Sequence, residues 1–222
     1  MAKHVNMMIH RQPEAKGPVR ENITYKDLSN GDVEVCRALC DELMRHQANV
    51  GLKYREILAS MNFDNRLKPS FHEAAIRRLL VAFDGETPIG YIFACVADIS
   101  EDAKYGPPPF SEAMKKEDAS GLGFIPRWLK CPASVGEIVN LYVKREYRKL
   151  HIGGVLMDEA MAWLRSYKTA EHVLVYVSNG NDPAAFYAKY GFTFSHDVLN
   201  GFIKCYSANM ARAASKQAAP AC

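Results

Sequence analysis

The sequence has no long apolar run. Its longest, residues 89–97, is far shorter than the ~20 residues that a membrane-spanning helix needs, so we expect neither a transmembrane segment nor a membrane partner. A secretory signal is also missing, since residues 1–9 include Lys3, His4 and Asn6, and no charged start is followed by a long apolar core. We therefore expect the protein in the cytoplasm.

Cysteine is sparse and forms no recognisable pattern. The six cysteines stand at positions 36, 40, 95, 131, 205 and 222, and no two of them form a CxxC pair. Four lie inside apolar segments, which predicts reduced, mostly buried thiols rather than a disulfide framework. Cys36 and Cys40 share a helix face, but no second pair of ligands stands nearby, so burial is favoured and no metal site is expected.

Excess charge of either sign is small as well. The 28 basic and 25 acidic residues leave a formal net charge of +3, which gives no indication of a nucleic-acid partner. A chain of 222 residues with 48% hydrophobic and 24% charged residues excludes collagen, coiled coil and wholesale disorder. We predict a flexible leader at 1–21, one folded domain at 22–208 and a flexible tail at 209–222.

Hydrophobic periodicity predicts an α/β fold, with a twisted mixed sheet of six to seven strands flanked by helices. Strands are expected near 23–26, 77–83, 88–98, 136–144, 173–177, 192–196 and 201–207, and helices near 31–47, 52–61 and 152–166. Asp84 and Gly85 predict a hairpin turn, whereas the unit 136–177 predicts a right-handed parallel crossover. Asp182 is expected to cap a short helix, with Pro183 at its first position and Gly191 just past its end.

Residues 99–134 form a long irregular insert. The insert contains three consecutive prolines, several glycines and spaced aromatic residues. A loop of this length inside a compact domain is usually functional or disordered. Its aromatics favour an ordered flap over a substrate site, with a helix near 111–117, and are too widely spaced for a nucleic-acid platform.

Segment 143–157 joins a strand to a helix through a short basic turn. The free backbone N–H groups at the start of that helix carry partial positive charge and point into the turn. Gly153 and Gly154 allow a ligand to approach the backbone closely. The basic side chains of the turn are Arg145, Arg148, Lys149 and His151. The arrangement predicts an anion site that suits a pyrophosphate, and a basic surface turn before an amphipathic helix is the alternative.

The stretch LYVKREYRKLHIGGVLMDEAM, followed after one more strand by FYAKYGF, resembles the GNAT superfamily of acetyl-CoA-dependent N-acetyltransferases. The pyrophosphate loop of that family reads Arg/Gln-x-x-Gly-x-Gly/Ala. Arg148 and Gly153 match its ends, whereas His151 replaces the middle glycine. His151 can adopt the left-handed conformation of a glycine at some cost, and it can donate to a phosphate. The resemblance implies a GNAT-like sheet and acetyl-CoA as cosubstrate.

The resemblance also implies which residues bind that cosubstrate. The strand whose backbone pairs with the pantetheine arm ends at Leu141, Tyr142 and Val143. The pyrophosphate cradle comprises Arg148, Lys149, Leu150, His151, Ile152, Gly153 and Gly154. An asparagine contact is expected at position 180, where Gly180 stands between Asn179 and Asn181, so one of these two asparagines is expected to bind the cosubstrate.

Two residues are implied as catalytic. Tyr187 matches the tyrosine that protonates the departing CoA thiolate, and a packed core tyrosine is the alternative. Glu137 matches the glutamate that some members use as general base, because a carboxylate can accept the amine proton directly or through water; a solvated or salt-bridged glutamate is the alternative. Asn140 and Tyr142 are expected to alternate in facing with Glu137 and Leu141, so that one pair lines the substrate side.

These residues together predict an N-acetyltransferase that moves acetyl from acetyl-CoA to a primary amine by direct attack. The alternatives are a catalytically weak acyl-CoA-binding or regulatory module, and an acyltransferase that uses a longer acyl-CoA. The acceptor is a small-molecule or peptide amine: polyamines, aminoglycosides, amino acids and protein amines all remain open. Region 45–72 and the insert are expected to form its pocket, and closing strands of this fold often pair in homodimers.

Acidic side chains of the insert are compatible with a cationic acceptor, although a solvated loop explains them equally well. These residues are Glu101, Asp102, Glu112, Glu117 and Asp118.

Overall fold

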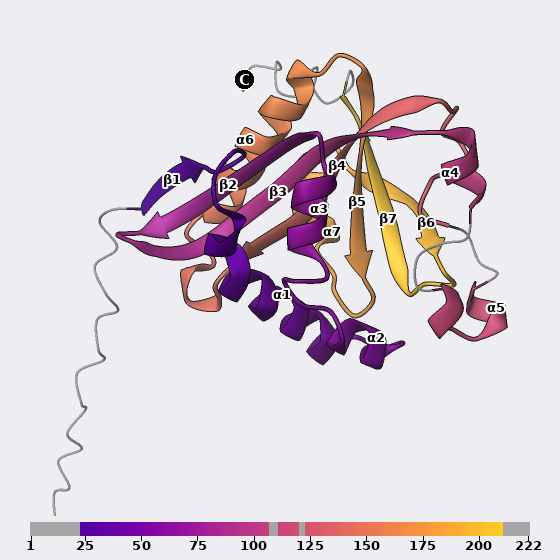
Figure 1. Ribbon diagram of the computed structural model, residues 1–222, viewed down its shortest axis with the longest axis horizontal. Coiled ribbons are helices and arrows are strands. Elements are labelled where there is room, and N and C mark those ends of the chain that lie inside the picture. The colour runs from indigo at the N-terminus through magenta and orange to yellow at the C-terminus, as the bar shows by residue number, and fades with distance from the viewer. Residues whose placement is uncertain (1–22, 107–110, 120–122, 211–222) are drawn as a thin grey trace, which may run out of the picture.

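Seven strands form one mixed sheet in the computed structural model, which describes residues 23–106, 111–119 and 123–210 (Figure 1). Along the chain they are β1 (Ile23–Asp27), β2 (Ile76–Asp84), β3 (Thr87–Ile99), β4 (Ala133–Val143), β5 (Ala170–Ser178), β6 (Thr193–Val198) and β7 (Ile203–Asn209). Their order across the sheet is β1-β2-β3-β4-β5-β7-β6. All neighbouring strands are antiparallel except β4 and β5, which are parallel, so the predicted mixed α/β sheet is confirmed.

The centre of the sheet opens because β4 and β5 pair over only part of their length. Their parallel register runs from Ser134 opposite Ala170 to Ile138 opposite Val175 and then stops, although both strands continue. A β-bulge lies at the same point: on β3, Ala94 pairs with Ile138 and Phe93 with Asn140, so β4 has one extra residue between them. A bulge bends its strand and raises the local twist, which separates the ends of β4 and β5.

Helices cover both faces of the sheet. The α-helices are α1 (Arg37–Val50), α2 (Arg55–Ala59), α3 (Leu67–Glu73), α4 (Glu101–Tyr105), α5 (Lys116–Ala119), α6 (Ile152–Ser166) and α7 (Ala184–Ala188). The 3-10 helices are η1 (Val33–Cys36), η2 (Ser111–Ala113) and η3 (Arg145–Tyr147). Figure 1 shows α1 and α3 in front of the sheet and α6 behind it, and the two apolar clusters described next correspond to these faces.

The two faces of the sheet are packed by separate sets of apolar side chains. Helix α6 presents Leu156, Ala160 and Leu164, spaced four residues apart, and all three are fully buried against the sheet. On the other face, Leu39 of α1 packs with Phe93 of β3 and their neighbours. Burying one such leucine or phenylalanine contributes about 1.5–3 kcal/mol, so both helices are held firmly in register with the strands.

Helix boundaries differ from the sequence-based predictions at several places. The helix expected at 31–47 consists of η1 and α1, the one at 52–61 shortens to α2, and the one near 111–117 is divided between η2 and α5. Helices α3 and α4 were not predicted; α3 includes Pro69, but at its third residue, where no intrahelical N–H bond is lost. The predicted Asp182 cap is wrong, because Pro183 occupies the N-cap position of α7 and no side chain caps that helix.

The C-terminal limit of the predicted domain also needs correction. Strand β7 continues to Asn209, and Met210 is buried in the core, so the folded part extends past residue 208 and the predicted tail does not begin at 209. The predicted leader at 1–21 and the rest of the tail lie outside the described residues.

The cysteines and the helix lengths of the described part bear on two further expectations from the sequence. Cys36, Cys40, Cys95 and Cys205 are free and buried, and Cys131 is free and half-buried, so most of the described thiols are buried as expected. None of the helices in the described ranges is both long enough and apolar enough to cross a membrane.

Candidate functional site

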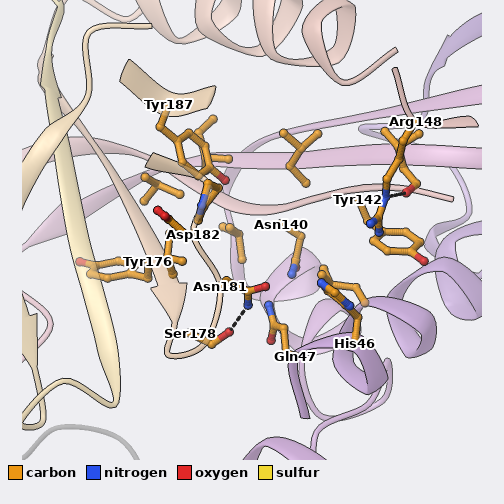
Figure 2. A pocket seen from close by; sticks show the side chains of 18 residues that line it. His46, Gln47, Asn140, Tyr142, Arg148, Tyr176, Ser178, Asn181, Asp182 and Tyr187 are labelled. Atoms are coloured by element: carbon orange, nitrogen blue, oxygen red, sulfur yellow. Dashed lines mark hydrogen bonds between the residues drawn. The ribbon is translucent and has the colours of Figure 1, made fainter. Parts of the chain in front are cut away.

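A cleft of about 320 Å³ fills the opening between β4 and β5 (Figure 2). Residues 138–143 of β4 form one wall and residues 175–178 of β5 form the other, while His46 and Gln47 reach in from α1. Beyond Ile138 the side of β4 that faces β5 has no strand partner, so its backbone polar groups are free to pair with an extended ligand. The predicted residues Leu141, Tyr142 and Val143 all line this cleft.

Tyr142 and Arg148 form the outer end of the cleft. The Tyr142 hydroxyl donates a hydrogen bond to Glu42 Oε2 (3.0 Å), and the Arg148 guanidinium lies 5.7 Å from the Tyr142 ring centroid. Arg148 Nε also donates to the Val143 carbonyl oxygen (3.1 Å), which fixes the guanidinium beside Tyr142 (Figure 2). Arg148 therefore provides a positive charge at the mouth of the cleft.

The turn before α6 has the backbone geometry of an anion-binding loop. Lys149 and His151 both adopt positive φ values, +65° and +64°, and His151 is the N-cap of α6. The imidazole of His151 lies over Gly154, where a Cβ atom would come within 2.6 Å of the ring. His151 thus adopts the conformation for which the family uses glycine, and Gly154 provides the space for its ring.

A separate cavity of about 420 Å³, here called the turn cavity, adjoins this turn. It is lined by Arg148, Lys149, His151, Gly153 and Gly154 and by side chains of the α7 region, and it shares Val143 and Arg148 with the cleft. Ile152, one of the predicted cradle residues, has its side chain buried in the core, so only its backbone can face a ligand. Leu150 is 41% exposed and lines neither cavity.

Of the two predicted asparagines, only Asn181 lines the cleft. Asn179 is buried, and its Oδ1 accepts hydrogen bonds from the backbone N–H groups of Leu52 and Lys53, while its Nδ2 donates to the carbonyls of Lys53 and Phe202. Asn179 therefore holds the α1–α2 connection and does not line the cleft. Asn181 donates from Nδ2 to Ser178 Oγ (2.7 Å) and lies in the cleft (Figure 2).

Tyr187 lines the inner wall of the cleft from α7. Its ring packs edge-on against Phe186 and Phe192, which fixes the direction of the phenol. Burial raises the pKa of Tyr187 to about 12, so the hydroxyl keeps its proton at neutral pH. Tyr187 is therefore packed in the core, as one of the two expectations had it, and it also lines the cleft.

A smaller chamber of about 150 Å³, here called the second chamber, continues the cleft toward the face of the sheet that α1 covers. Its walls are formed by Met44, Gln47, Leu58, Met61, Arg66, Phe124, Glu137, Val139, Asn140, Tyr176, Ser178 and Ile203. Five of these residues also line the cleft: Gln47, Val139, Asn140, Tyr176 and Ser178. The two spaces are therefore adjoining parts of one site.

Glu137 projects into the second chamber rather than into solvent. It forms no hydrogen bond or salt bridge with any residue that the structure describes, which excludes the predicted alternative of a salt-bridged surface glutamate. The carboxyl group contacts the chamber but is otherwise enclosed by protein, and this burial raises its pKa to about 7 against an opposing effect of Arg66. A carboxylate with this pKa suits proton acceptance near neutral pH.

Asn140, one of the β4 residues considered as lining the substrate side, lies where the cleft and the second chamber meet. It is buried, and its Oδ1 has no hydrogen-bond partner in the described part of the chain. Simple alternation along a strand would place Asn140 and Glu137 on opposite faces, but both line the chamber because the bulge at Val139 inserts one residue between them. The predicted alternation is therefore wrong at this point.

Residues from both regions expected to form an acceptor pocket meet at the second chamber. Leu58, Met61 and Arg66 come from region 45–72, and Phe124 comes from the insert. The carbonyl of Phe124 accepts a hydrogen bond from the Tyr176 hydroxyl (3.0 Å), which ties the insert to β5. None of the insert's described acidic residues lines the chamber, and Asp118 instead accepts hydrogen bonds from Tyr54 and Asn200.

A family model and solved structures both match this chain. The family model described as "Acetyltransferase (GNAT) family" matches residues 41–192. The PaiA N-acetyltransferase from Thermoplasma acidophilum, solved in complex with coenzyme A, is 19% identical over 85% of this chain and 99% of its own, with a TM-score of 0.55. FeeM, an N-acyl amino acid synthase from uncultured soil microbes, is 14% identical over 87% of this chain and 94% of its own, with a TM-score of 0.52. No curated protein matches the sequence significantly.

Proposed function

The chain belongs to the GNAT acetyltransferase family, and from that premise we propose that it transfers an acetyl group from acetyl-CoA to a primary amine. The observation that supports this most directly is the cleft between β4 and β5, which leads from a basic turn at its mouth to the buried carboxyl group of Glu137. The acceptor is a small-molecule or peptide amine.

The residues of the cleft fit an acyl-CoA. Arg148, Lys149 and the first backbone N–H groups of α6 suit the pyrophosphate, and the unpaired side of β4 suits an amide-containing arm. The Oδ1 of Asn140, buried without a partner, provides an acceptor for an N–H group at the inner end of the cleft. The likeness to the coenzyme A complex of PaiA supports the same ligand class.

Acetyl-CoA supplies an acyl carbon that is activated as a thioester, and the protein supplies proton transfer and positioning. Glu137 takes one proton from the acceptor's ammonium group, so that the nitrogen lone pair becomes available. As the amine nitrogen bonds to the acyl carbon and the carbon–sulfur bond breaks, Tyr187 donates its proton to the departing sulfur and is restored by the second proton of the nitrogen. The walls of β4 and β5 hold the two reactants in one orientation.

A longer acyl group is the second candidate, because the fold is shared with FeeM, an N-acyl amino acid synthase. Acetyl-CoA and a medium-chain acyl-CoA would be compared as donors with the same acceptors. Faster turnover of the longer donor would replace acetyl in the proposal and leave the rest unchanged.

Calorimetric titration with acetyl-CoA and with free CoA tests the proposal. Replacing both Arg148 and Lys149 with Ala is expected to weaken binding at least ~10-fold, since two charged contacts to phosphate are lost. The matched control is Lys144→Ala with Arg145→Ala, which removes two charges from the same turn but outside both cavities. Absence of binding to either ligand would overturn the proposal, and binding without turnover on any amine would indicate a regulatory acyl-CoA-binding module.

A further inference from the structure

Arg66 is the basic residue of the second chamber, and its charge has no carboxylate partner within the part of the chain that the structure describes. It stands at the N-cap of α3 and lines the chamber, and its buried Nε has no hydrogen-bond partner among the described residues. No salt bridge joins Arg66 to any acidic residue in the described ranges. A half-buried guanidinium without a counter-ion is costly, and a bound anion would offset that cost.

Arg66 and Glu137 face the same small space from different elements. Both side chains line the second chamber, yet no ion pair joins them among the described residues. The guanidinium lowers the pKa of Glu137, against the effect of burial. Other groups that act on Glu137 or are acted on by it are uncharged: Cys95, Cys205 and Tyr176. The chamber thus presents one positive and one negative group to a ligand that lies between them.

The size and the walls of the chamber limit what that ligand can be. A cavity of about 150 Å³ accommodates a ligand the size of benzene, roughly six non-hydrogen atoms. Apart from the polar groups already described, the walls are apolar and include Met44, Leu58 and Met61. An ammonium group, a carboxylate and a short apolar side chain on one carbon atom fit both the charges and the volume.

We infer that the acceptor is a small α-amino acid, whose carboxylate pairs with Arg66 while its amine lies between Asn140 and Glu137. This inference rests on the proposed function, because it assigns an acceptor to the same site. The guanidinium matches a carboxylate in geometry and charge. Asn140 Oδ1 accepts an N–H of the amine at the junction with the cleft, and Glu137 accepts its proton.

The inference separates the acceptor classes that the sequence left open. A polyamine or an aminoglycoside would place a second cation beside Arg66, which costs free energy in a half-buried site. A protein N-terminus or a lysine side chain has no carboxylate on the carbon next to its amine, so Arg66 would stay unpaired. Only a free amino acid satisfies both charged groups of the second chamber.

Matched acceptors test the inference on the unaltered protein. L-alanine, L-alaninamide, ethylamine and spermidine would be compared by release of CoA from acetyl-CoA. We expect kcat/KM for alanine to exceed that for alaninamide by ~10–100-fold, the range for one hydrogen-bonded charge pair. Alaninamide has the more readily deprotonated amine, so general amine reactivity favours the opposite order.

Arg66 variants then assign the preference to this residue. Arg66→Gln is expected to lower kcat/KM for alanine by the same factor and to leave alaninamide within ~2-fold, whereas Arg66→Lys retains an intermediate preference. Arg45→Gln is the matched control, because Arg45 is exposed on the neighbouring helix α1 and does not line the chamber. Thermal unfolding and the Kd for acetyl-CoA would be measured for every variant, to separate folding from recognition.

Three outcomes would overturn the inference. Alaninamide or spermidine could react as fast as alanine, or no small amino acid could react although acetyl-CoA binds. Alternatively, Arg66→Gln could slow alanine and alaninamide equally and move the pH profile upward, which would make Arg66 only a modulator of Glu137. Failure of acetyl-CoA to bind at all would instead refute the proposed function. If Arg66→Gln does not fold, the comparison of alanine with alaninamide still decides.

Discussion

The imidazole of His151 occupies the space above Gly154 that the side chain of any other residue would need. A Cβ atom at Gly154 would lie 2.6 Å from Cε1 of His151 and 2.9 Å from both ring nitrogens. His151 itself stands at a φ of +64°, which costs an ordinary residue about 1–2 kcal/mol. The two positions therefore depend on each other, since the histidine ring fits only where the residue three positions later is glycine.

Gly154→Ala is expected to displace the His151 ring and to distort the turn that faces the phosphates. We expect a loss of stability of about 1 kcal/mol and a ~10-fold weaker Kd for acetyl-CoA. In a His151→Gly background the same alanine meets no ring, so a double-mutant cycle should show strong coupling in both measurements. Additive effects would show that the ring does not constrain the turn.

Glu137→Gln should abolish the pH dependence that a general base imposes. In the unaltered protein kcat/KM is expected to rise with pH and to reach half its maximum at about pH 7, because the carboxyl group must lose its proton before it can accept another. The glutamine variant should lose ~100-fold or more in kcat/KM and show no such rise. An unchanged rate would exclude Glu137 as the base.

The same carboxyl group should reduce stability above neutral pH. Burial raises its pKa from an ordinary value of 4.5 to about 7, so the folded state holds a proton that the unfolded state releases between these pH values. The contribution of Glu137 to the free energy of unfolding therefore falls as pH rises through that interval. Glu137→Gln removes the loss, and at pH 8 it should be more stable by about 2–3 kcal/mol, with little difference at pH 4.5. Denaturant titrations at both pH values measure this.

Local patterns in the sequence were sufficient to predict the sheet and the turn before α6. The strand and helix around Arg148 are contiguous in the chain, so periodicity and composition describe them directly. The left-handed conformation of His151 followed from its place in the loop pattern. What these features share is that their contacts lie within a few residues of one another.

The second chamber could not be predicted in the same way, because its walls come from distant segments. Arg66 precedes a short helix with no strong periodicity, and only the tertiary fold brings it near Glu137. The shared facing of Glu137 and Asn140 depends on a bulge at Val139, and no glycine or proline in β4 marks that position. Register irregularities of this kind depend on packing against neighbouring strands.

Asn179 and Asn181 lie in different surroundings although only Gly180 separates them in the sequence. Gly180 between them has a φ of +83°, and a Cβ there would come within 1.8 Å of the Val50 carbonyl oxygen, so the chain presses against the end of α1. This contact directs Asn179 toward the backbone of Leu52 and Lys53 and leaves Asn181 in the cleft. The sequence left open which of the two asparagines faces the cosubstrate, since a contact across more than a hundred residues leaves no local pattern.

Asn179→Ala should therefore mainly reduce stability, whereas Asn181→Ala should mainly weaken acetyl-CoA binding. Asn179→Ala leaves the buried backbone groups that its amide now satisfies without partners, which should lower the free energy of unfolding by about 3 kcal/mol. Asn181→Ala removes one hydrogen bond to Ser178 and should cost about 1 kcal/mol or less, but it should weaken acetyl-CoA binding ~5-fold or more because its amide lies in the cleft. Denaturant unfolding and calorimetric titration of both variants distinguish the two roles. If Asn179→Ala weakened binding more than it reduced stability, its assignment as a structural residue would be wrong.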